Sequence, residues 1–260
     1  IRHGMSTLYR AGDVVVRVVP GEQDVERVLW LAEALIARDV RVARHVRSPY
    51  VAEGAAVFAL ELLHEVRPTD WRRVGEMVRS VHDWPVDEVM PHHALPRAAD
   101  FPWWQVETIL AEVDDLLDGG AREGLGAAIA AHGDWRDRTT ALVVCHGDVH
   151  PGNVLQTDDG PVLLDWDLLS LAPAAWDHAP MLTWEHRWGG EAGMYEQFAT
   201  GYGADLRDGP LARSLAVMRN VAATLMRLRA GRADPVAAAE AQRRLAYWRG
   251  VPAAPQWQAA

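Results

Sequence analysis

The chain has 260 residues, of which 49% are hydrophobic and 24% charged, and its formal net charge is -10 at pH 7. This composition is ordinary for a globular protein, and the negative charge argues against a nucleic-acid partner. All 26 basic residues are arginines, which excludes a Schiff-base lysine and a phosphate loop of the GxxxxGK[ST] type. Cys145 is the single cysteine, so an internal disulfide is excluded. The sequence shows neither a run of 18 apolar residues nor a signal peptide, so we expect a cytoplasmic protein without a membrane partner.

The N-terminal residues 1–65 are predicted to form a β-rich lobe with one helix. Gly12 lies in a turn signal between two short apolar runs, which is typical of a hairpin. The Ser48-Pro49-Tyr50 segment is expected to separate two further strands. Strands are predicted over residues 8–10, 14–18, 42–46 and 55–63, and the one helix, residues 22–38, lies between the second and third strands.

Residues 66–260 are predicted to form a larger, mostly helical lobe, so the expected fold class is α+β. A proline- and histidine-rich stretch, residues 83–100, is expected to be a loop. Two short apolar strands, 142–145 and 162–164, are expected to pair as a hairpin, because Asp158-Asp159-Gly160 is a turn signal. Helices are predicted over residues 71–82, 103–117, 122–132, 191–202, 210–230 and 234–249.

The segment 145–167, CHGDVHPGNVLQTDDGPVLLDWD, contains the residues best suited to chemistry. Its two polar clusters directly follow two apolar strands, where a rigid scaffold presents side chains. Asp148 and Asn153 lie on one loop, and Asp165 ends the next strand. Their carboxylate and amide oxygens are ligands that suit Mg²⁺, which completes its coordination shell with water and substrate phosphate.

The motifs HGDVHPGN and LLDWD, in this order and spacing, resemble those of the aminoglycoside phosphotransferase and choline kinase family. The resemblance covers essentially the whole chain and implies the two-lobed fold of protein kinases. It implies that Asp148 is the catalytic base and that Asn153 and Asp165 hold Mg²⁺ on the phosphates of ATP or GTP. The reaction implied is transfer of a phosphoryl group to a hydroxyl of a small molecule. Asp177 resembles the family's structural aspartate.

The resemblance also implies which residues hold the nucleotide. Arg17 stands where the family places the cation that reaches the α and β phosphates, with Glu26 as its expected ion-pair partner and Glu22 and Glu33 as rivals. The loop at residues 3–7 matches the family's loop over the phosphates and contributes Ser6 and Thr7. Glu61 and Leu63 resemble the hinge, whose backbone binds adenine.

A cationic acceptor is expected, most readily an antibiotic of the aminoglycoside type or a basic cyclic peptide of the viomycin and capreomycin kind. The acidic segment 100–118, with six carboxylates and no basic residue, borders the acceptor cleft in this family and would steer a polycation. Trp184 and Glu185 lie in the region that lines the acceptor pocket, and an aromatic face suits a cation. His150 and Asp167 are further substrate candidates. Arginines, by contrast, are frequent in the C-terminal region.

Three other functions remain possible for this sequence. One is a metabolic kinase of choline, a sugar or an amino acid. Another is a nucleotide-binding pseudoenzyme, against which the intact Asp148, Asn153 and Asp165 argue. The third is a metal-dependent hydrolase that uses His146 and His150 as ligands in an HxDxH pattern. Against it, His146 is expected to lock the loop through hydrogen bonds.

Overall fold

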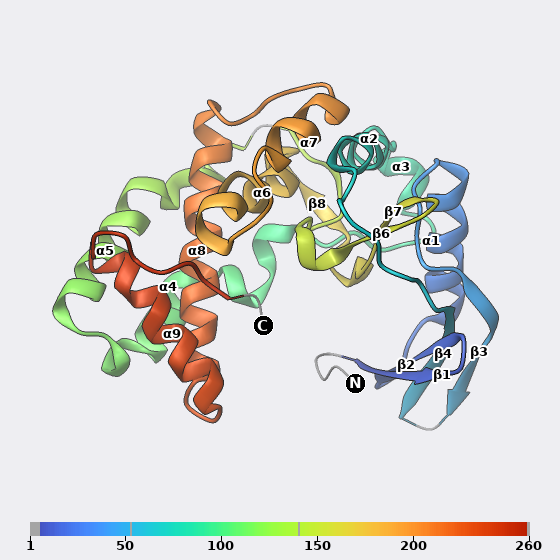
Figure 1. Ribbon diagram of the computed structural model, residues 1–260, viewed down its shortest axis with the longest axis horizontal. Coiled ribbons are helices and arrows are strands. Elements are labelled where there is room, and N and C mark those ends of the chain that lie inside the picture. Colours follow the sequence, from blue (N-terminus) through green and yellow to red (C-terminus); the bar gives the residue numbers. More distant parts are fainter. Residues whose placement is uncertain (1–5, 53, 140, 259–260) are drawn as a thin grey trace.

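The computed structural model describes residues 6–52, 54–139 and 141–258. An antiparallel sheet with one helix forms a small lobe at the right of Figure 1, and a larger, mostly helical lobe extends to the left. Among the described helices, none combines the length and the apolar character that a membrane crossing requires.

The small lobe is built on a four-stranded sheet in the order β1-β2-β4-β3, with every neighbouring pair antiparallel. Arg17 lies on the inner strand β2, opposite Leu8 of β1 and Phe58 of β4. Helix α1 follows β2, and the Asp24 side chain caps it by accepting a hydrogen bond from the Arg27 N–H at 3.0 Å. The bounds of these elements are β1 Thr7–Ala11, β2 Val14–Pro20, α1 Val25–Ala37, β3 His45–Ala52 and β4 Ala55–Glu61.

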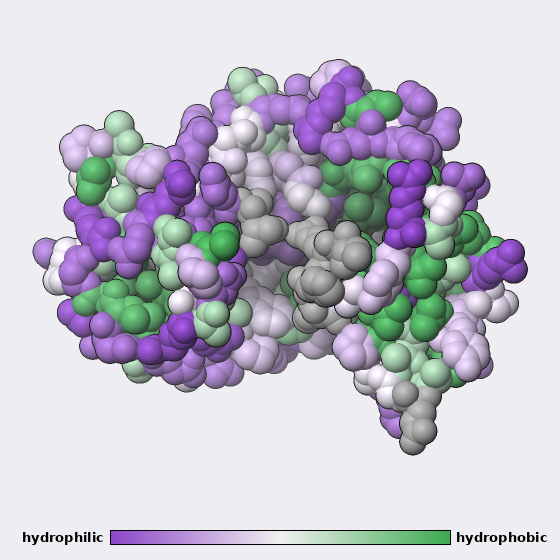
Figure 2. Space-filling view, turned by 60° about the horizontal axis from the view of Figure 1, so that its bottom comes forward, coloured by the Kyte–Doolittle hydropathy of each residue, from purple (hydrophilic) through white to green (hydrophobic). Residues whose placement is uncertain are grey.

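The prediction for β3 was wrong in its position. The strand begins at His45 and continues through the Ser48-Pro49-Tyr50 segment, which was expected to separate two strands. Its pairing with β4 shifts register between His45 and Arg47 and again between Arg47 and Tyr50. Pro49 is tolerated because β3 is an edge strand, where irregular pairing leaves its missing N–H without cost. On the face shown in Figure 2, hydrophobic residues gather mainly at the right, over this lobe.

The small lobe shares its packing with the large one. Leu31 and Leu35 of α1 belong to the same buried cluster as residues of α2 and α7. The segment after α1 is also tied to the large lobe, because the Arg41 carbonyl accepts from the Leu163 N–H at 2.9 Å and its guanidinium donates to the Gly160 carbonyl at 2.9 Å. These contacts fix where β2 and Arg17 stand relative to the strands that follow residue 140.

The large lobe is assembled on helices, as predicted. Asp70 caps α2, and α2 packs closely on α7 because glycines stand at the crossing: a Cβ on Gly75 would lie 2.0 Å from the Phe198 carbonyl oxygen, and one on Gly201 would lie 1.8 Å from that of Arg72. The helices are α2 Trp71–His82, α3 Val86–Val89, α4 Val106–Glu112, α5 Gly119–His132, α6 Ala175–Trp188, α7 Met194–Tyr202, α8 Pro210–Ala230 and α9 Pro235–Trp248.

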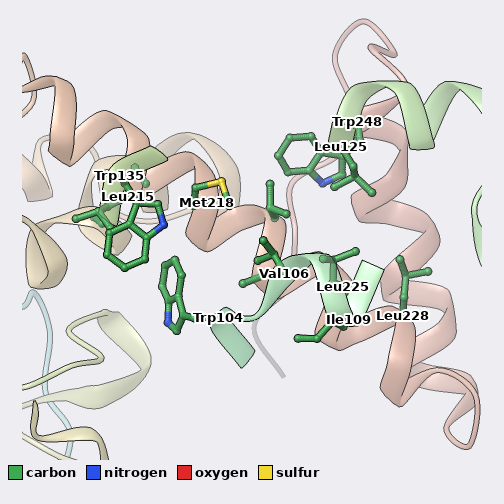
Figure 3. Close-up of a cluster of buried hydrophobic side chains, with 14 of the residues drawn as sticks. Trp104, Val106, Ile109, Leu125, Trp135, Leu215, Met218, Leu225, Leu228 and Trp248 are labelled. Atoms are coloured by element: carbon green, nitrogen blue, oxygen red, sulfur yellow. The ribbon is translucent and has the colours of Figure 1, made fainter. Parts of the chain in front are cut away.

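Helix α8 is the centre of the second buried cluster. It presents Leu215, Met218 and Leu225 toward α4, α5 and the tryptophans that precede β5 (Figure 3). Trp104 contacts Trp135 with ring centroids 5.6 Å apart in an edge-on arrangement. Each buried aromatic or leucine side chain of this kind stabilises the fold by roughly 1.5–3 kcal/mol, so α8 is held rigidly in register.

The two strands predicted around segment 145–167 exist, but their expected pairing was wrong. Strand β5 (Val143–Cys145) pairs with β8 (Ser170–Ala172), and β7 (Gly160–Leu163) pairs with β6 (Val154–Thr157). The Asp158-Asp159-Gly160 turn joins β6 to β7. The error arose because β6 and β8 are short and carry no clear alternation of apolar and polar residues.

Three segments of the large lobe also differ from the prediction in their helix content. The helix expected over 103–117 is only α4, flanked by 3-10 turns at Pro102–Trp104 and Asp114–Leu116. The loop expected over 83–100 contains α3 and a short turn. Helix α6 was not predicted, because Pro180 lies inside it and its first half is buried on all sides, which removes the amphipathic pattern.

We predict that stability falls in acid because of His178. Burial lowers its pKa to about 3, and the nearby His82 adds to this shift. The pKa of His178 is lower in the native state than in the unfolded chain, so the unfolded chain takes up the proton first as the pH falls. The contribution of neutral His178 to the free energy of unfolding is therefore complete above about pH 6.5, and it declines toward pH 3 by about 1.4 kcal/mol per pH unit. Urea unfolding near pH 7 and near pH 5 should show this slope, reduced in His178→Asn. The exposed His64→Asn is the control, and equal slopes in all three proteins would contradict the assignment.

Candidate active site

One buried carboxylate fixes the loop between β5 and β6. Asp177, in the first turn of α6, is 0% exposed and accepts hydrogen bonds from the backbone N–H groups of His146 (2.8 Å) and Gly147 (2.9 Å). Its Oδ2 also lies 3.0 Å from His82 Nε2. Burial alone would raise the pKa of Asp177, but His82, His146 and the backbone donors hold it below the usual value. The structural role expected for Asp177 agrees with this geometry.

Gly147 and His146 complete the shape of the loop. Gly147 has φ +93°, and a Cβ there would lie 2.1 Å from the Leu168 carbonyl oxygen, so only glycine fits. His146 Nδ1 accepts from the Asp148 N–H at 3.2 Å, and Nε2 donates to the Leu164 carbonyl at 3.0 Å. Burial lowers the pKa of His146, which keeps this neutral tautomer. Both ring nitrogens are therefore engaged, as the loop-locking hypothesis requires.

The metal-hydrolase alternative finds no support in these contacts. Because His146 uses both nitrogens on the backbone, it has no lone pair for a metal shared with His150. Among the described residues, His82, Cys145 and Asp177 bring three potential ligand atoms within 4.8 Å. Asp177 accepts from the loop and contacts His82, and the Cys145 thiol donates to the carbonyls of Ala172 and Pro173. Burial also raises the pKa of the Cys145 thiol well above its usual range, which disfavours a thiolate ligand.

Asp148 stands at the centre of a polar group on this loop. Its Oδ1 accepts from the guanidinium of Arg219 on α8, and its Oδ2 lies 3.3 Å from His150 Nε2. Asn153 Nδ2 donates to the Asp148 carbonyl at 3.0 Å and to Oδ2 at 3.1 Å. The carboxylate remains 23% exposed, so it is oriented from several sides yet open to a ligand. Burial lowers the pKa of Arg219 to about 10, which leaves it charged at neutral pH.

Asn153 and Asp165 are neighbours across the β6-β7 hairpin. The backbone carbonyl of Asn153 accepts a hydrogen bond from the Leu164 N–H at 2.9 Å, and Asp165 directly follows Leu164 in the chain. Because Asn153 directs its amide nitrogen at Asp148, its amide oxygen is left as an acceptor. Asp165 is exposed, and no hydrogen bond or ion pair engages its carboxylate within the described chain. Its backbone has φ 63°, a left-handed conformation that is uncommon outside glycine and frequent at functional sites.

Arg17 reaches from the small lobe to this region. Its guanidinium donates to Ser6 Oγ at 3.1 Å and pairs with the carboxylate of Asp167. The expected pair with Glu26 is not formed: Glu26 lies in the first turn of α1, and Asp167 takes its place. The rivals Glu22 and Glu33 form no ion pair with Arg17 either, within the residues described.

The remaining nucleotide candidates surround the start and end of the sheet. Thr7 begins β1 opposite Val18, whereas residues 3–5 of the expected phosphate loop lie outside the described residues. Glu61 ends β4, where its backbone and side chain both bond to Arg44. Leu63 follows it, and in the described part of the chain its backbone groups have no hydrogen-bond partner. A free backbone at this point is what a hinge for a purine requires.

A cavity of about 660 Å³ opens beside Asp148, between α6 and α8. Trp184 on its wall stacks with His150 (ring centroids 4.7 Å apart) and with Trp188 (4.9 Å). Two substrate candidates do not belong to this wall. Glu185 accepts from the Gly193 N–H at 3.1 Å, before α7, and Asp167 pairs with Arg17, so both have structural partners elsewhere.

No residue of the acidic segment 100–118 is among the described residues that line the cavity. Four of its six carboxylates are paired with arginines of the helical lobe, which compensates much of its negative charge. The pairs are Asp114–Arg122, Asp115–Arg232, Asp118–Arg249 and Glu112–Arg229.

The cavity instead carries arginines that the sequence reasoning did not assign to a site. Arg219 and Arg227 of α8 and Arg244 of α9 line it, and none of its described lining residues is acidic. The signal was the spacing on α8, where positions 219, 223 and 227 fall on one helical face. No local motif marks such a face, because it becomes part of a cavity only when α8 is packed against the loop of Asp148.

Comparisons with known proteins agree with this arrangement. A family model described as the phosphotransferase enzyme family matches residues 6–213, more than half of the chain. The structure is similar to an aminoglycoside 2'-phosphotransferase in complex with GDP (16% identity, 96% of this chain and 91% of that chain, TM-score 0.74). It is also similar to an AMP-bound spectinomycin phosphotransferase (14%, 93% and 86%, TM-score 0.70).

A third similar structure is a choline/ethanolamine kinase family protein from Mesorhizobium loti (18% identity, 96% and 86% covered, TM-score 0.61). No curated protein matches the sequence. The expected α+β fold of the protein-kinase type is confirmed by these likenesses. At such identities they establish the fold, and they include kinases of different small molecules.

We predict that Asp177→Ala lowers the free energy of unfolding by about 3–5 kcal/mol, the scale for removing one member of a buried charged network. The physical reason is that His82 and two backbone N–H groups lose their acceptor. Urea denaturation followed by circular dichroism measures the change. Asp208→Ala, at an exposed position, is the control and should stay within about 0.5 kcal/mol of wild type. A loss of activity without a loss of stability would contradict the structural role.

Proposed function

This chain belongs to the phosphotransferase enzyme family, and we propose that it transfers the γ-phosphoryl group of ATP or GTP to a hydroxyl of a small molecule. The observation that supports this most directly is the convergence of Asp148, Asn153 and Asp165 at the ends of β5 and β7, with Arg17 facing them from the small lobe. We place the reaction in the cytoplasm, where nucleoside triphosphates are supplied.

The nucleotide would lie between the lobes. In this proposal the free backbone of Leu63 binds the base, while Arg17 and Ser6 approach the phosphates from the sheet. A guanidinium can bind phosphate oxygens with two parallel hydrogen bonds, as it binds a carboxylate. Asn153 Oδ1 and the Asp165 carboxylate fit Mg²⁺, which takes one or two protein oxygens and would neutralise phosphate charge when bound there.

Asp148 then serves the acceptor. Its carboxylate accepts the proton of the acceptor hydroxyl as the oxygen forms a bond to the γ-phosphorus and the bond from phosphorus to the leaving nucleoside diphosphate breaks. Arg219, His150 and Asn153 contact Asp148 from three sides and keep it pointing to one place. Phosphoryl transfer depends mainly on such positioning, so a small set of residues is sufficient.

The chemical class of the acceptor also belongs to this proposal. An antibiotic is a candidate, because similar structures include phosphotransferases of aminoglycosides and spectinomycin; a metabolic small molecule is the alternative, in view of the choline/ethanolamine kinase family protein. The sequence favoured a cationic acceptor, most readily an antibiotic. The arginines of the cavity argue against that charge, since like charges at a binding surface cost affinity.

For Asp148→Asn we expect the turnover number to fall by about 10²–10⁴, because the proton acceptor is removed. Nucleotide binding should be largely kept, since Asp148 contacts the acceptor and not the phosphates in this proposal. Turnover with a responsive acceptor and calorimetric titration of Mg²⁺-ATP measure the two quantities. Unchanged turnover, or loss of nucleotide binding in a folded variant, would show that the base is misassigned.

For Arg17 the informative pair is Arg17→Lys and Arg17→Ala. Lysine keeps the charge but provides no planar fork, so the Michaelis constant for ATP should rise, and more so for alanine. Arg10→Ala, on the neighbouring strand β1 and without an ion pair in the described chain, is the control. If Arg17→Ala leaves both the Michaelis constant and turnover at the wild-type values, Arg17 does not bind the phosphates.

A further inference from the structure

Among the described arginines that line the cavity beside Asp148, one has no anion partner. Arg219 is balanced by Asp148, and Arg244 is balanced by Glu240, 2.9 Å away. Arg227 also lines the cavity and is half-buried, yet its side chain forms no ion pair or hydrogen bond within the described residues. Because the charge of Arg227 has no anion partner in the described part of the chain and lies at the cavity lining, this position is suited to an anionic ligand.

The surroundings of Arg227 strengthen the case. Burial lowers the pKa of Arg244, and the charge of the nearby Arg227 lowers it further, although Glu240 opposes the shift. Two guanidinium groups therefore approach each other at one end of the cavity with a single carboxylate, Glu240, which Arg243 also contacts at 3.1 Å. That end of the cavity has an excess of positive charge.

The geometry of α8 gives the distance between this end and the reacting end. Arg219 and Arg227 lie eight residues apart on one helix, which corresponds to about 12 Å at the rise of an α-helix. Between them the wall is mostly apolar or aromatic, formed by Trp184 and Trp188 of α6 and by Met226 of α8. Arg244 stacks on Trp188, 4.6 Å from the ring centroid, which holds that ring in place.

We propose that the cavity selects an elongated acceptor that has a hydroxyl at one end, an apolar or flat middle, and an oxyanion at the far end bound by Arg227. The oxyanion is a carboxylate or a phosphate ester, since the guanidinium fork matches both. The hydroxyl end rests on the proposed function, because it assumes that Asp148 is the base. The anion end rests on Arg227 and its neighbours alone.

The test uses the full chain and three probes of equal length: 10-hydroxydecanoate, 10-hydroxydecanamide and 10-aminodecan-1-ol. Binding is followed through the fluorescence of the cavity tryptophans in the presence of ADP. We expect the carboxylate to bind at least about tenfold more tightly than the amide, the scale of one hydrogen bond to a charged group, and the amine to bind most weakly. The monophosphate of 1,10-decanediol, as a fourth probe, separates a phosphate preference from a carboxylate preference.

Variants of α8 decide whether Arg227 is responsible. Arg227→Gln should remove the preference for the carboxylate over the amide, and Arg227→Glu should reverse it in favour of the amine. Arg213→Gln is the matched control, since Arg213 is exposed on the same helix and outside the cavity. Circular dichroism confirms that each variant is folded.

The outcomes separate this proposal from the proposed function. Equal binding of the probes, no binding of any of them, or an unchanged preference in Arg227→Gln would overturn the anionic-acceptor proposal, even if the protein binds Mg²⁺-ATP. A carboxylate preference that depends on Arg227, together with failure to bind any nucleotide, would instead contradict the proposed function and leave the pocket assignment standing.

Discussion

The buried carboxylate of Asp177 is the contact on which the site depends. Its position in the first turn of α6 connects this helix to two other parts of the chain: the loop after β5 through His146 and Gly147, and α2 through His82. A charge in such a place is tolerated only because both carboxylate oxygens are hydrogen-bonded. The other end of α6 presents Trp184 and Trp188 to the cavity, so one helix positions both the loop of Asp148 and a wall of the cavity.

The contact of Arg17 with Asp167 has a comparable role between the lobes. It brings the one cation of β2 to the residue that lies two positions after Asp165. Carboxylate and phosphate oxygens present similar partners to a guanidinium. In the proposed function a phosphate of the nucleotide therefore takes the place of the Asp167 carboxylate as the partner of Arg17. The free-energy cost of removing water from Arg17 arises when the lobes pack together and does not arise again when the nucleotide binds.

The strong predictions from sequence were those with local causes. A capped, amphipathic segment specifies α2, and the two motifs specify the order Asp148, Asn153, Asp165 because a short hairpin must join them. Strand partners were predicted less well: β5 pairs with β8 and not with β7, since three-residue strands contain too little pattern to choose a partner. Helix α6 was missed because Pro180 and all-round burial both obscure a helix in sequence. Partners of Arg17 and Asp148 lie about 150 and 71 positions away, and only tertiary packing brings them near.

The lining of the cavity shows why net charge is a poor guide to a binding site. The chain carries -10 overall, yet four of the six carboxylates of the acidic segment are paired with Arg122, Arg229, Arg232 and Arg249, and the charges of those pairs largely cancel beyond a Debye length of about 8–10 Å. What an acceptor meets is the local lining, and there α8 contributes arginines at the spacing of one helical face. Because the chain has no lysine, each of these cations is a planar fork that stays charged at neutral pH. Such groups favour a carboxylate or phosphate over a diffuse negative surface, so the anionic acceptor that we propose would be selected by geometry as well as by charge.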